Sequence, residues 1–557
     1  MSPDVESKPG EPATDGVDEF DVVVLGSGAA ALTAALAAHN GGSSVAVLEK
    51  ADRLGGTSAW SGGMVWIPNN PHMPEIGVPD SRDEALTYLD SLSQGLIEPP
   101  LAEAFVDAGP EMVRWVEAET PVKFQIIEGF PDYHPEQPGG KPGGGRSMEC
   151  PLFPFDTLGE WADRVTVGPQ YSGAIMISET PLGHGPPDGV PEAEAARRAE
   201  HDERGSGQAL IGALLKGCLD RGVDLRTDAR AVELVMDDRR VVGVVVETPA
   251  GRTTVQARQG VVLATGGFEW DPELVRSFIR GPLERSVSVP TNTGDGLKMA
   301  MRIGAALGNM REAWWAPTID VPDDDGHVHS WMVNGERSRP HTIMVNRSGK
   351  RFTNEATNYN AFGAAFHNID VTTAEYTNLP CWVVFDRFFL ERYGLASYRV
   401  DQGEVPAWMI EAPTLSALAE RLGIPDHAFE DTVERWNKHV ADGEDPDFGR
   451  GRSAHDNWWG DSALTGPGRA TLGPIDTPPF YAVEAHSGTL GTKGGPRTTP
   501  DAQVIDVDGD PIDGLYAAGN VMASAMGMTY GGAGGTLGPG MVFGYLAGRH
   551  IAGRPRR

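Results

Sequence analysis

Two glycines and one acidic residue near the N-terminus have the spacing of a nucleotide-binding turn. Gly26 and Gly28 follow an apolar run, Ala31 stands at the third position of a GxGxx(G/A) pattern, and Glu49 lies about twenty residues further on. Gly26 allows a tight turn, and Gly28 lets backbone N–H groups approach a pyrophosphate at a helix N-terminus. Glu49 can accept hydrogen bonds from ribose hydroxyls. These residues predict a dinucleotide site, with the small Ala31 in place of a third glycine.

The elements that must position this turn are readable on both sides of it. Phe20–Leu25 is a continuous apolar and β-branched run, which is typical of a buried strand. An Ala/Leu-rich helix follows to about Ala38, and Ser44–Leu48 predicts a second strand that ends at Glu49. Together they form a βαβ unit of about thirty residues. We therefore expect an α/β, Rossmann-like domain.

The loop after the second strand indicates which dinucleotide is bound. Gly55–Gly56 and Thr57–Ser58, within ADRLGGTSAWSGGMVWIP, resemble the phosphate- and flavin-contacting loop of two-dinucleotide-binding flavoproteins. Two later apolar segments, GVVLATGGFEWDP at 260–272 and IDGLYAAGNVMASAM at 512–526, resemble strands that return to the FAD site. We predict FAD, and we expect it to be held non-covalently because GGTSAWSGG contains no histidine.

These segments imply a discontinuous FAD-binding domain with an inserted cap. A chain of 557 residues is too long for one core. We expect a disordered tail at 1–17, FAD-binding parts at 18–295 and 480–557, and an α+β catalytic cap at 296–479 with helices of its own. Between 221 and 240 we expect a strand reaching Ala231 and then a hairpin around Asp237–Arg240. The region 150–204, rich in Pro, Gly and charge, shows no readable pattern.

Composition excludes several classes of partner. The formal net charge of −32 argues against nucleic acid and anionic membrane surfaces. No apolar run reaches about 18 residues, so no membrane span is expected, and the N-terminus lacks the features of a signal peptide. The three cysteines, Cys150, Cys218 and Cys381, form no CxxC pair, so we expect no metal and no disulfides. This usage fits the cytoplasm.

A family resemblance extends from Asp18 to the end of the chain. The chain resembles the fumarate reductase/3-ketosteroid dehydrogenase flavoprotein superfamily, and within it the 3-ketosteroid Δ1-dehydrogenases (3-oxosteroid 1-dehydrogenases). The stretches that carry the resemblance include PDYHPEQPGGKPGGGRSME at 131–149, VNRSGKRFTNEATNY at 345–359 and GLYAAGNVMASAMGMTYGGAGGTLGPGMVFGYLAG at 514–548. The last of these is specific to the family.

The resemblance implies desaturation of the C1–C2 bond of a 3-ketosteroid. A proton leaves C2 for a base, and hydride passes from C1 to flavin N5. By position, Tyr359 matches the proton-abstracting tyrosine, Tyr133 the tyrosine that supports it, and Tyr530 the donor to the 3-keto oxygen. Gly534 matches the glycine whose N–H completes the oxyanion site. A free phenol has a pKa near ~10 and is a poor base, so a second phenol to stabilise the phenolate makes chemical sense.

The same resemblance implies the cofactor contacts. Backbone near Ala231 is expected to meet the adenine. The full expected set is Gly26, Gly28, Ala29, Ala30, Glu49, Lys50, Gly55, Gly56, Thr57, Ser58, Ser61, Gly62, Gly63, Ala231, Thr265, Gly266, Gly519, Asn520, Leu537 and Gly538. No second nucleotide fingerprint occurs, so we expect electrons to leave for a separate, quinone-like or protein acceptor.

Other activities stay open at this point. Dehydrogenases of smaller cyclic ketones, such as cyclohexanone or its carboxylated derivatives, share the scaffold, and Δ4-(5α) steroid dehydrogenases are a further option, although TYGGAGG favours the Δ1 type. A fumarate-reductase-like enoate reductase is less favoured, because GGAGGTLGPG at 531–540 contains no arginine to clamp a dicarboxylate. An FAD-binding protein without activity would have no use for three tyrosines beside an oxyanion glycine.

Overall fold

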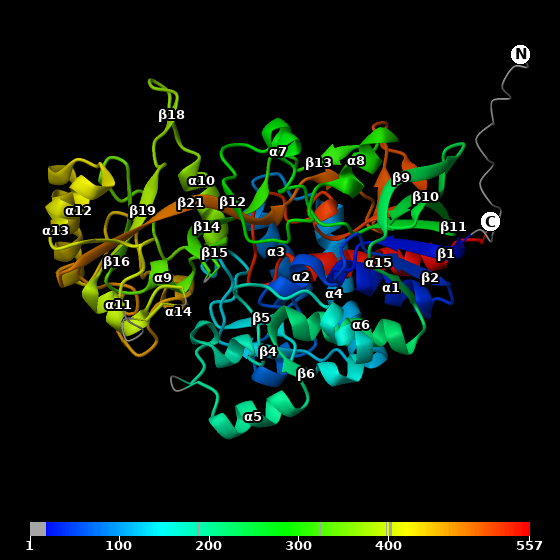
Figure 1. Cartoon of the computed structure of the whole chain (residues 1–557), viewed down its shortest axis with the longest axis horizontal. Helices are drawn as coiled ribbons and strands as arrows, with labels where there is room; N and C mark the ends of the chain where they lie inside the picture. Colours follow the sequence, from blue (N-terminus) through cyan, green and yellow to red (C-terminus); the bar gives the residue numbers. More distant parts are fainter. Residues whose placement is uncertain are drawn as a thin grey trace, which may run out of the picture.

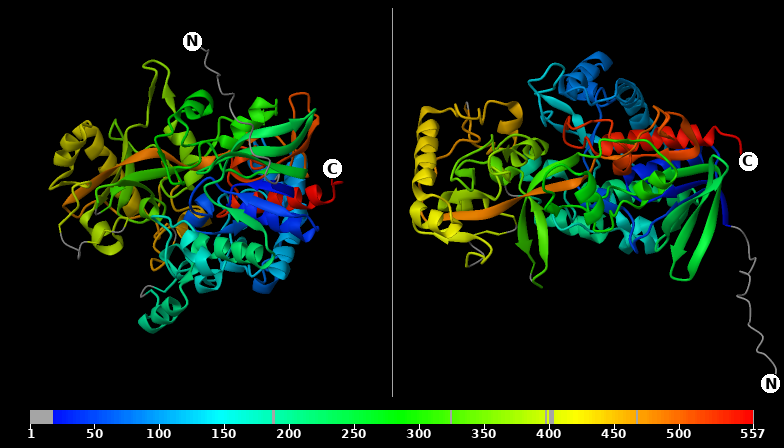
Figure 2. Two further views of the ribbon diagram at one scale, coloured as in Figure 1. Left: turned by 45° about the vertical axis from the view of Figure 1, so that its right-hand side comes forward. Right: turned by 90° about the horizontal axis from the view of Figure 1, so that it is seen from above.

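The protein has two lobes, each built around its own β-sheet (Figures 1 and 2). The computed structural model describes residues 18–186, 189–323, 325–396, 398–399, 404–466 and 468–556, and the predicted tail at 1–17 lies outside them. Both the first and the last described residues lie at the lobe drawn on the right of Figure 1. The predicted α/β fold is confirmed.

The first lobe holds an eight-stranded sheet in the order β23-β24-β10-β11-β1-β2-β8, with β9 paired to β10. Its central strands β1, β2, β11 and β24 run parallel. Val22–Leu25 are at most 1% exposed, as expected of a strand covered on both faces. The strands are β1 (Asp18–Leu25), β2 (Val45–Leu48), β8 (Asp224–Arg226), β9 (Arg230–Asp237), β10 (Arg240–Thr248), β11 (Gly251–Leu263), β23 (Gln503–Ile505) and β24 (Pro511–Ala517).

Helices α1 (Ala29–Asn40) and α15 (Leu537–Ala552) pack closely beside this sheet. Glycines make this possible, because a Cβ on Gly544 would lie 2.4 Å from the Ala30 carbonyl oxygen and one on Gly548 would lie 2.4 Å from that of Ala34. The N-terminal βαβ unit and the C-terminal helix therefore form one core, although the first ends at Leu48 and the second begins at Leu537.

One local prediction in this lobe was wrong. The strand expected to reach Ala231 ends earlier, since β8 stops at Arg226 and Ala231 belongs to β9, where it pairs with Val246. The predicted hairpin around Asp237–Arg240 is confirmed as the turn between β9 and β10.

The second lobe holds a seven-stranded sheet in the order β15-β14-β21-β19-β16, with β12 and β20 also paired to β21. β21 is 13 residues long and runs from this lobe toward the first (Figures 1 and 2). Helices α12 (Leu415–Leu422) and α13 (Asp426–Asp442) lie at the far end. The strands are β12 (Arg285–Ser286), β14 (Ala313–Pro322), β15 (Val328–Met332), β16 (Thr342–Asn346), β19 (Cys381–Asp386), β20 (Ile410–Ala412) and β21 (Phe480–Thr492).

The strands of this sheet span residues 285–492, a wider range than the predicted cap of 296–479. The predicted domain boundaries stay a prediction. Strand pairing alone would place them near 285 and 492, because β12 and the whole of β21 pair within the second sheet.

Two remaining groups of elements lie against the first lobe. α3 (Arg82–Ser93) and α4 (Pro99–Glu119) accompany a small sheet of β3 (Val65–Trp66), β4 (Gln125–Glu128) and β5 (Gly144–Glu149). The unreadable region 150–204 forms short helices, η2 (Phe155–Arg164), η3 (Ile177–Glu179), η4 (Pro181–Gly183) and α5 (Glu192–Glu200), drawn at the lower edge of Figure 1. Within the described residues, no helix combines the length and apolar character needed to cross a membrane.

Candidate active site

A cavity extends from the ends of β1 and β2 to the contact between the two lobes. All the predicted cofactor and catalytic residues line it except Gly55 and Gly538. These two glycines have packing reasons for their type. A Cβ on Gly55 would lie 2.8 Å from the Ala59 Cβ, and one on Gly538 would lie 2.2 Å from the Trp66 carbonyl oxygen.

The turn between β1 and α1 forms one wall of the cavity. Gly26 has φ +101°, and a Cβ there would lie 2.3 Å from the Ala264 carbonyl oxygen, so only glycine fits. Gly28 is the N-cap of α1 and has no side chain to cap it, while the Ala29 N–H donates to Ser58 Oγ over 3.1 Å. The partly positive end of α1 therefore opens on the cavity, where it favours a phosphate group.

Charged residues gather at the end of the cavity beside β2. Glu49 is buried and accepts a hydrogen bond from Ser27 Oγ at 2.6 Å, and burial raises the pKa of its carboxyl group. Lys50 and Arg230 both form ion pairs with Asp295, at 2.9 Å each. This end offers acceptors and donors suited to a ribose and its adenine.

The three predicted tyrosines meet at the other end of the cavity. The Tyr133 hydroxyl donates to the Tyr359 hydroxyl over 3.0 Å. The ring centroids of Tyr133, Tyr359 and Tyr530 lie 5.1 to 5.4 Å from one another, and each residue is at most 5% exposed. Thr536 Oγ1 donates to the Tyr530 hydroxyl over 2.8 Å, which leaves the Tyr530 proton for another acceptor.

Backbone contacts explain why residues so far apart in sequence meet. Tyr133 lies between β4 and β5, and its N–H donates to the Gly531 carbonyl over 3.0 Å. Tyr359 begins the short helix η5 (Tyr359–Ala361), and the neighbouring Asn360 side chain donates to the Met528 carbonyl over 3.1 Å. Both tyrosines are thus tied to the loop that carries Tyr530.

Burial dominates the electrostatics of the three phenols. It raises the pKa of Tyr133 and of Tyr359 well above the usual value of about 10. It also raises the pKa of Tyr530, against the opposing hydrogen bond from Thr536. Because Tyr133 and Tyr359 share a hydrogen bond, loss of a proton belongs to the pair, and only one of the two ionises at a time.

Gly534 lies in the same loop and lines the cavity. Its φ is +98°, and a Cβ would lie 2.5 Å from the Met64 carbonyl oxygen. A side chain is therefore excluded at this position, both by the backbone conformation and by the close approach of β3.

Several cavity residues escaped the sequence reasoning. Thr536 is the one residue with a hydroxyl group in the glycine-rich segment GGAGGTLGPG. This feature could have indicated that Thr536 is a hydrogen-bond partner of Tyr530. Arg230 reaches the cavity from β9, and Asp295 reaches it from the start of α8 (Asp295–Arg302). No sequence pattern around either residue identifies it as part of a binding site. Tyr171 and Gln170 come from the unreadable region, where Gln170 bonds twice to the backbone of Met332, at 3.1 and 3.2 Å.

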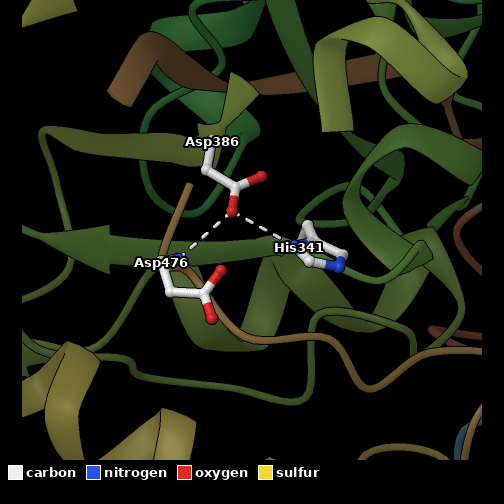
Figure 3. A group of neighbouring side chains, drawn as sticks. All are labelled: His341, Asp386 and Asp476. Atoms are coloured by element: carbon white, nitrogen blue, oxygen red, sulfur yellow. Dashed lines mark hydrogen bonds and ion pairs between the residues drawn. The ribbon is translucent and has the colours of Figure 1, made fainter. Parts of the chain in front are cut away.

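Two groups of His and acidic side chains elsewhere are close enough to share an ion. In the group of Figure 3, the buried Asp386 carboxylate accepts from His341 Nδ1 at 3.1 Å and from the Asp476 N–H at 3.2 Å. It also caps α11 (Arg387–Tyr393) through the Phe389 N–H. The second group, His439, Asp445 and Asp447, uses Asp445 to bind Arg351. Both carboxylates thus have structural roles, and the expectation of no metal stays a prediction.

Comparison with known proteins identifies the class. The chain belongs to the FAD binding domain family, which it matches over residues 21–537. It is an FAD-dependent oxidoreductase, and FAD is confirmed as its cofactor. The residues present fit that group, since the α1 N-terminus, which Gly28 does not cap, and the glycines at 26, 28 and 519 leave a backbone-lined channel between Glu49 and the tyrosines.

Particular relatives narrow the class further. The chain is 44% identical to 4-oxocyclohexanecarboxylate 2-dehydrogenase of Sinomonas cyclohexanicum, covering 96% of this chain and 93% of the relative. It is 39% identical to 3-oxosteroid 1-dehydrogenase of Mycobacterium tuberculosis, covering 96% and 99%. The crystal structure of 3-ketosteroid Δ1-dehydrogenase from Sterolibacterium denitrificans, in complex with 1,4-androstadiene-3,17-dione, is 36% identical, with a TM-score of 0.89 and coverage of 96% and 100%. The resemblance expected from the sequence is confirmed.

Proposed function

We propose that the protein desaturates the C1–C2 bond of a 3-ketosteroid and passes the electrons to an external acceptor. The observation that carries this proposal is the meeting of Tyr133, Tyr359 and Tyr530 at one end of a cavity whose other end suits a dinucleotide. The proposal also draws on the likeness to the steroid dehydrogenases.

Each protein group has one task in this reaction. Tyr359 takes the proton from C2, and Tyr133, which donates a hydrogen bond to Tyr359, stabilises the phenolate form. Tyr530 donates its proton to the 3-keto oxygen, since its own oxygen already accepts from Thr536, and the Gly534 N–H supplies a second donor. FAD, when bound, accepts hydride at N5.

The charge of the cavity favours a neutral ketone over a carboxylated one. Among the described residues that line it, the only Lys and Arg are Lys50 and Arg230, and both are engaged by Asp295 at the end beside β2. A carboxylate at the tyrosine end would lose its hydration without gaining a permanent cation. Met332 and Leu182 add apolar surface to the cavity wall.

A second candidate is the dehydrogenation of 4-oxocyclohexanecarboxylate. The 44% identity to an enzyme of that name favours it, and the same three tyrosines could serve a monocyclic ketone. Both candidates use the same dehydrogenation chemistry. They differ because a carboxylated substrate would require a cationic side chain to pair with its carboxylate.

A substrate screen tests the proposal. The purified yellow enzyme is mixed without oxygen with androst-4-ene-3,17-dione, cyclohexanone, 4-oxocyclohexanecarboxylate or succinate, and loss of flavin absorbance is followed. We expect rapid bleaching by the steroid alone, and turnover with an artificial electron acceptor. Bleaching by a monocyclic ketone together with silence toward several 3-ketosteroids would overturn the proposed substrate, and bleaching by none would overturn the reaction itself.

A further inference from the structure

A buried hydroxyl group joins the two loops that carry Tyr133 and Tyr530. It belongs to Tyr88 in α3, whose side chain is 0% exposed. The Tyr88 hydroxyl donates to the Gly531 carbonyl over 2.7 Å and accepts from the His134 N–H over 3.1 Å. His134 follows Tyr133 in the chain, and Gly531 follows Tyr530. One side chain thus binds the immediate neighbours of two site tyrosines.

The residue on the other side of Tyr133 is held by a second set of contacts. Asp132 is 1% exposed, and its carboxylate accepts from Trp66 Nε1 and from Arg146 Nη1, at 2.8 Å each. The Trp66 ring also lies against Gly531, since a Cβ on this glycine would lie 2.7 Å from the ring. The residues before and after Tyr133 are therefore both bound to groups that contact Gly531.

The ring of Tyr88 rests on the same buried network. The Arg146 guanidinium group lies 5.2 Å from the ring centroid of Tyr88, and it pairs with Asp80 and with Asp132 at 2.8 Å each. The Trp66 ring centroid lies 6.2 Å from that of Tyr88. Burial raises the pKa of Tyr88 well above its usual value, so the hydroxyl keeps its proton for the carbonyl that it binds.

These contacts let Tyr88 act on the site without touching it. Tyr88 is not among the described residues that line the cavity. The Tyr133 and Tyr530 ring centroids lie 5.1 Å apart, and the Tyr133 hydroxyl lies 3.0 Å from that of Tyr359. Loss of the Tyr88 hydroxyl would leave the His134 N–H without this acceptor, which is unfavourable, so the chain after Tyr133 would shift.

A direct bond also joins the two loops, because the Tyr133 N–H donates to the Gly531 carbonyl over 3.0 Å. A single hydrogen bond lets the loops turn about it, whereas a second bond at the next residue opposes that rotation. We therefore expect Tyr88 to control the direction of the Tyr133 side chain more than the attachment of the loops. Removal of the Tyr88 hydroxyl should leave the fold and FAD binding intact.

We propose that Tyr88 is a positioning residue that sets the spacing between the Tyr133–Tyr359 pair and Tyr530. The inference rests on the proposed function. In that reaction the Tyr359 phenolate takes the C2 proton, the electron pair left at C2 forms the C1–C2 double bond, and hydride leaves C1 for FAD. Tyr530 binds the oxygen on C3, the carbon next to C2. The base and the donor must reach neighbouring carbons together, and a misplacement of about 1 Å costs on the order of 10²-fold in rate.

Two variants separate this role from a general loss of packing. Tyr88→Phe removes the hydroxyl and keeps the ring. Tyr516→Phe is the matched control, because Tyr516 is also 0% exposed and its hydroxyl contacts His550 Nδ1 at 2.8 Å, outside the residues that line the cavity. Both variants should keep their FAD. Loss of FAD in Tyr88→Phe alone would contradict the proposal, because the hydroxyl would then support the fold and not the spacing.

The first readout needs no ketone. Crystal structures of the oxidised, FAD-loaded wild type and of both variants are compared. In Tyr88→Phe we expect the Tyr133 hydroxyl to move relative to Tyr530 and its 3.0 Å contact with Tyr359 to lengthen. The Tyr516→Phe structure should match the wild type at all three tyrosines. Unchanged tyrosine positions in Tyr88→Phe would overturn the proposal.

The second readout is single-turnover flavin reduction by androst-4-ene-3,17-dione, unlabelled or carrying deuterium at C1 or at C2. In Tyr88→Phe the limiting rate should fall by about 10- to 10²-fold, while the half-saturating steroid concentration stays near that of the wild type. The C2 isotope effect should grow relative to the C1 effect, because the altered spacing slows proton removal. An unchanged ratio of the two effects would indicate a general loosening of the site and would contradict a positioning role.

The two readouts also separate this inference from the proposed function. If no ketone reduces the flavin of the wild type, the proposed function fails, while the crystal structures still decide whether Tyr88 sets the tyrosine geometry. If the tyrosines shift in Tyr88→Phe but the steroid reduces the flavin at the wild-type rate, the positioning role is refuted and the proposed function stands.

Discussion

At the scale of single residues, the site divides one reaction among hydroxyl groups that are otherwise alike. Tyr133 and Tyr530 differ in what surrounds their oxygens, because Tyr133 donates to Tyr359, whereas Tyr530 accepts from Thr536. The direction of each hydrogen bond, more than the residue type, suits one phenol to support a base and the other to polarise a ketone.

Removing either working hydroxyl should therefore stop the reaction while the flavin stays bound. We expect Tyr359→Phe and Tyr530→Phe each to slow steroid-dependent flavin reduction by about 10²- to 10⁴-fold, measured in single-turnover experiments. Tyr376→Phe, in the short strand β18 (Glu375–Tyr376) and away from the cavity, is the control and should react like the wild type. Full activity in either active-site variant would refute its assigned role.

A second residue-scale feature is the buried amine of Lys493. It donates to the Thr529 carbonyl over 2.7 Å, beside Tyr530, and lies 4.2 Å from the centroid of the Trp314 ring. Burial lowers its pKa to about 7. An unfolded lysine keeps its proton up to about pH 10, so between about pH 7 and pH 10 the unfolded state binds the extra proton. The contribution of Lys493 to stability therefore improves as pH rises through this window.

Lys493→Met should remove this pH dependence. The free energy of unfolding of the variant, relative to the wild type, should fall by about 1 kcal/mol per pH unit from about pH 7 to pH 9. Urea unfolding of the FAD-loaded protein measures it, and Lys438→Met, exposed on α13, serves as the control. A difference that stays constant across this range would show that the amine is protonated in the folded state throughout.

At the scale of elements, the turn between β1 and α1 admits a direct test of the cofactor channel. Gly26→Ala would place a Cβ 2.3 Å from the Ala264 carbonyl oxygen in β11's continuation, so the turn must move away from the sheet. We expect the variant to be purified with little or no FAD, as read from the ratio of flavin to protein absorbance. Gly42→Ala is the matched control, since Gly42 also has a positive φ but meets no atom within 4 Å.

The elements also show what could be predicted from sequence. Phe20–Leu25 and the helix to Ala38 were placed within two residues, because continuous apolar runs between glycines leave little choice. The tyrosine positions came from a resemblance to a family, since a lone Tyr carries no local signal. Arg230 was missed for the same physical reason, as it meets its partner Asp295 only through the fold.

β21 illustrates a different limit. Its residues fall within the predicted second FAD-binding part, 480–557, but they pair with β14 and β19 of the second sheet. These partners are more than 90 residues away in sequence, and no pattern within 480–492 reveals them. Pairing of this kind depends on the whole sheet, which is why strand membership extends beyond the predicted cap boundaries.

At the scale of the whole molecule, the net charge of −32 bears on how electrons leave the flavin. Like charges slow association, and salt screens the effect. Reoxidation of the substrate-reduced enzyme by ferricyanide, an anion, should therefore become faster as ionic strength rises. Reoxidation by a neutral quinone is the internal control and should change little. A ferricyanide rate that falls with salt would indicate a local cationic docking site that overrides the net charge.

The short helices between 155 and 186 have a consequence for how such an enzyme can diverge. η4 supplies Leu182 to the cavity wall and the loop between η2 and η3 supplies Tyr171, yet this segment contributes no strand to either large sheet. Substitutions there can reshape the compartment that admits a ketone without touching the nucleotide channel or the three phenols. This part of the wall and the three phenols thus lie on separate stretches of chain, and we expect a change of substrate to be possible by remodelling the wall alone.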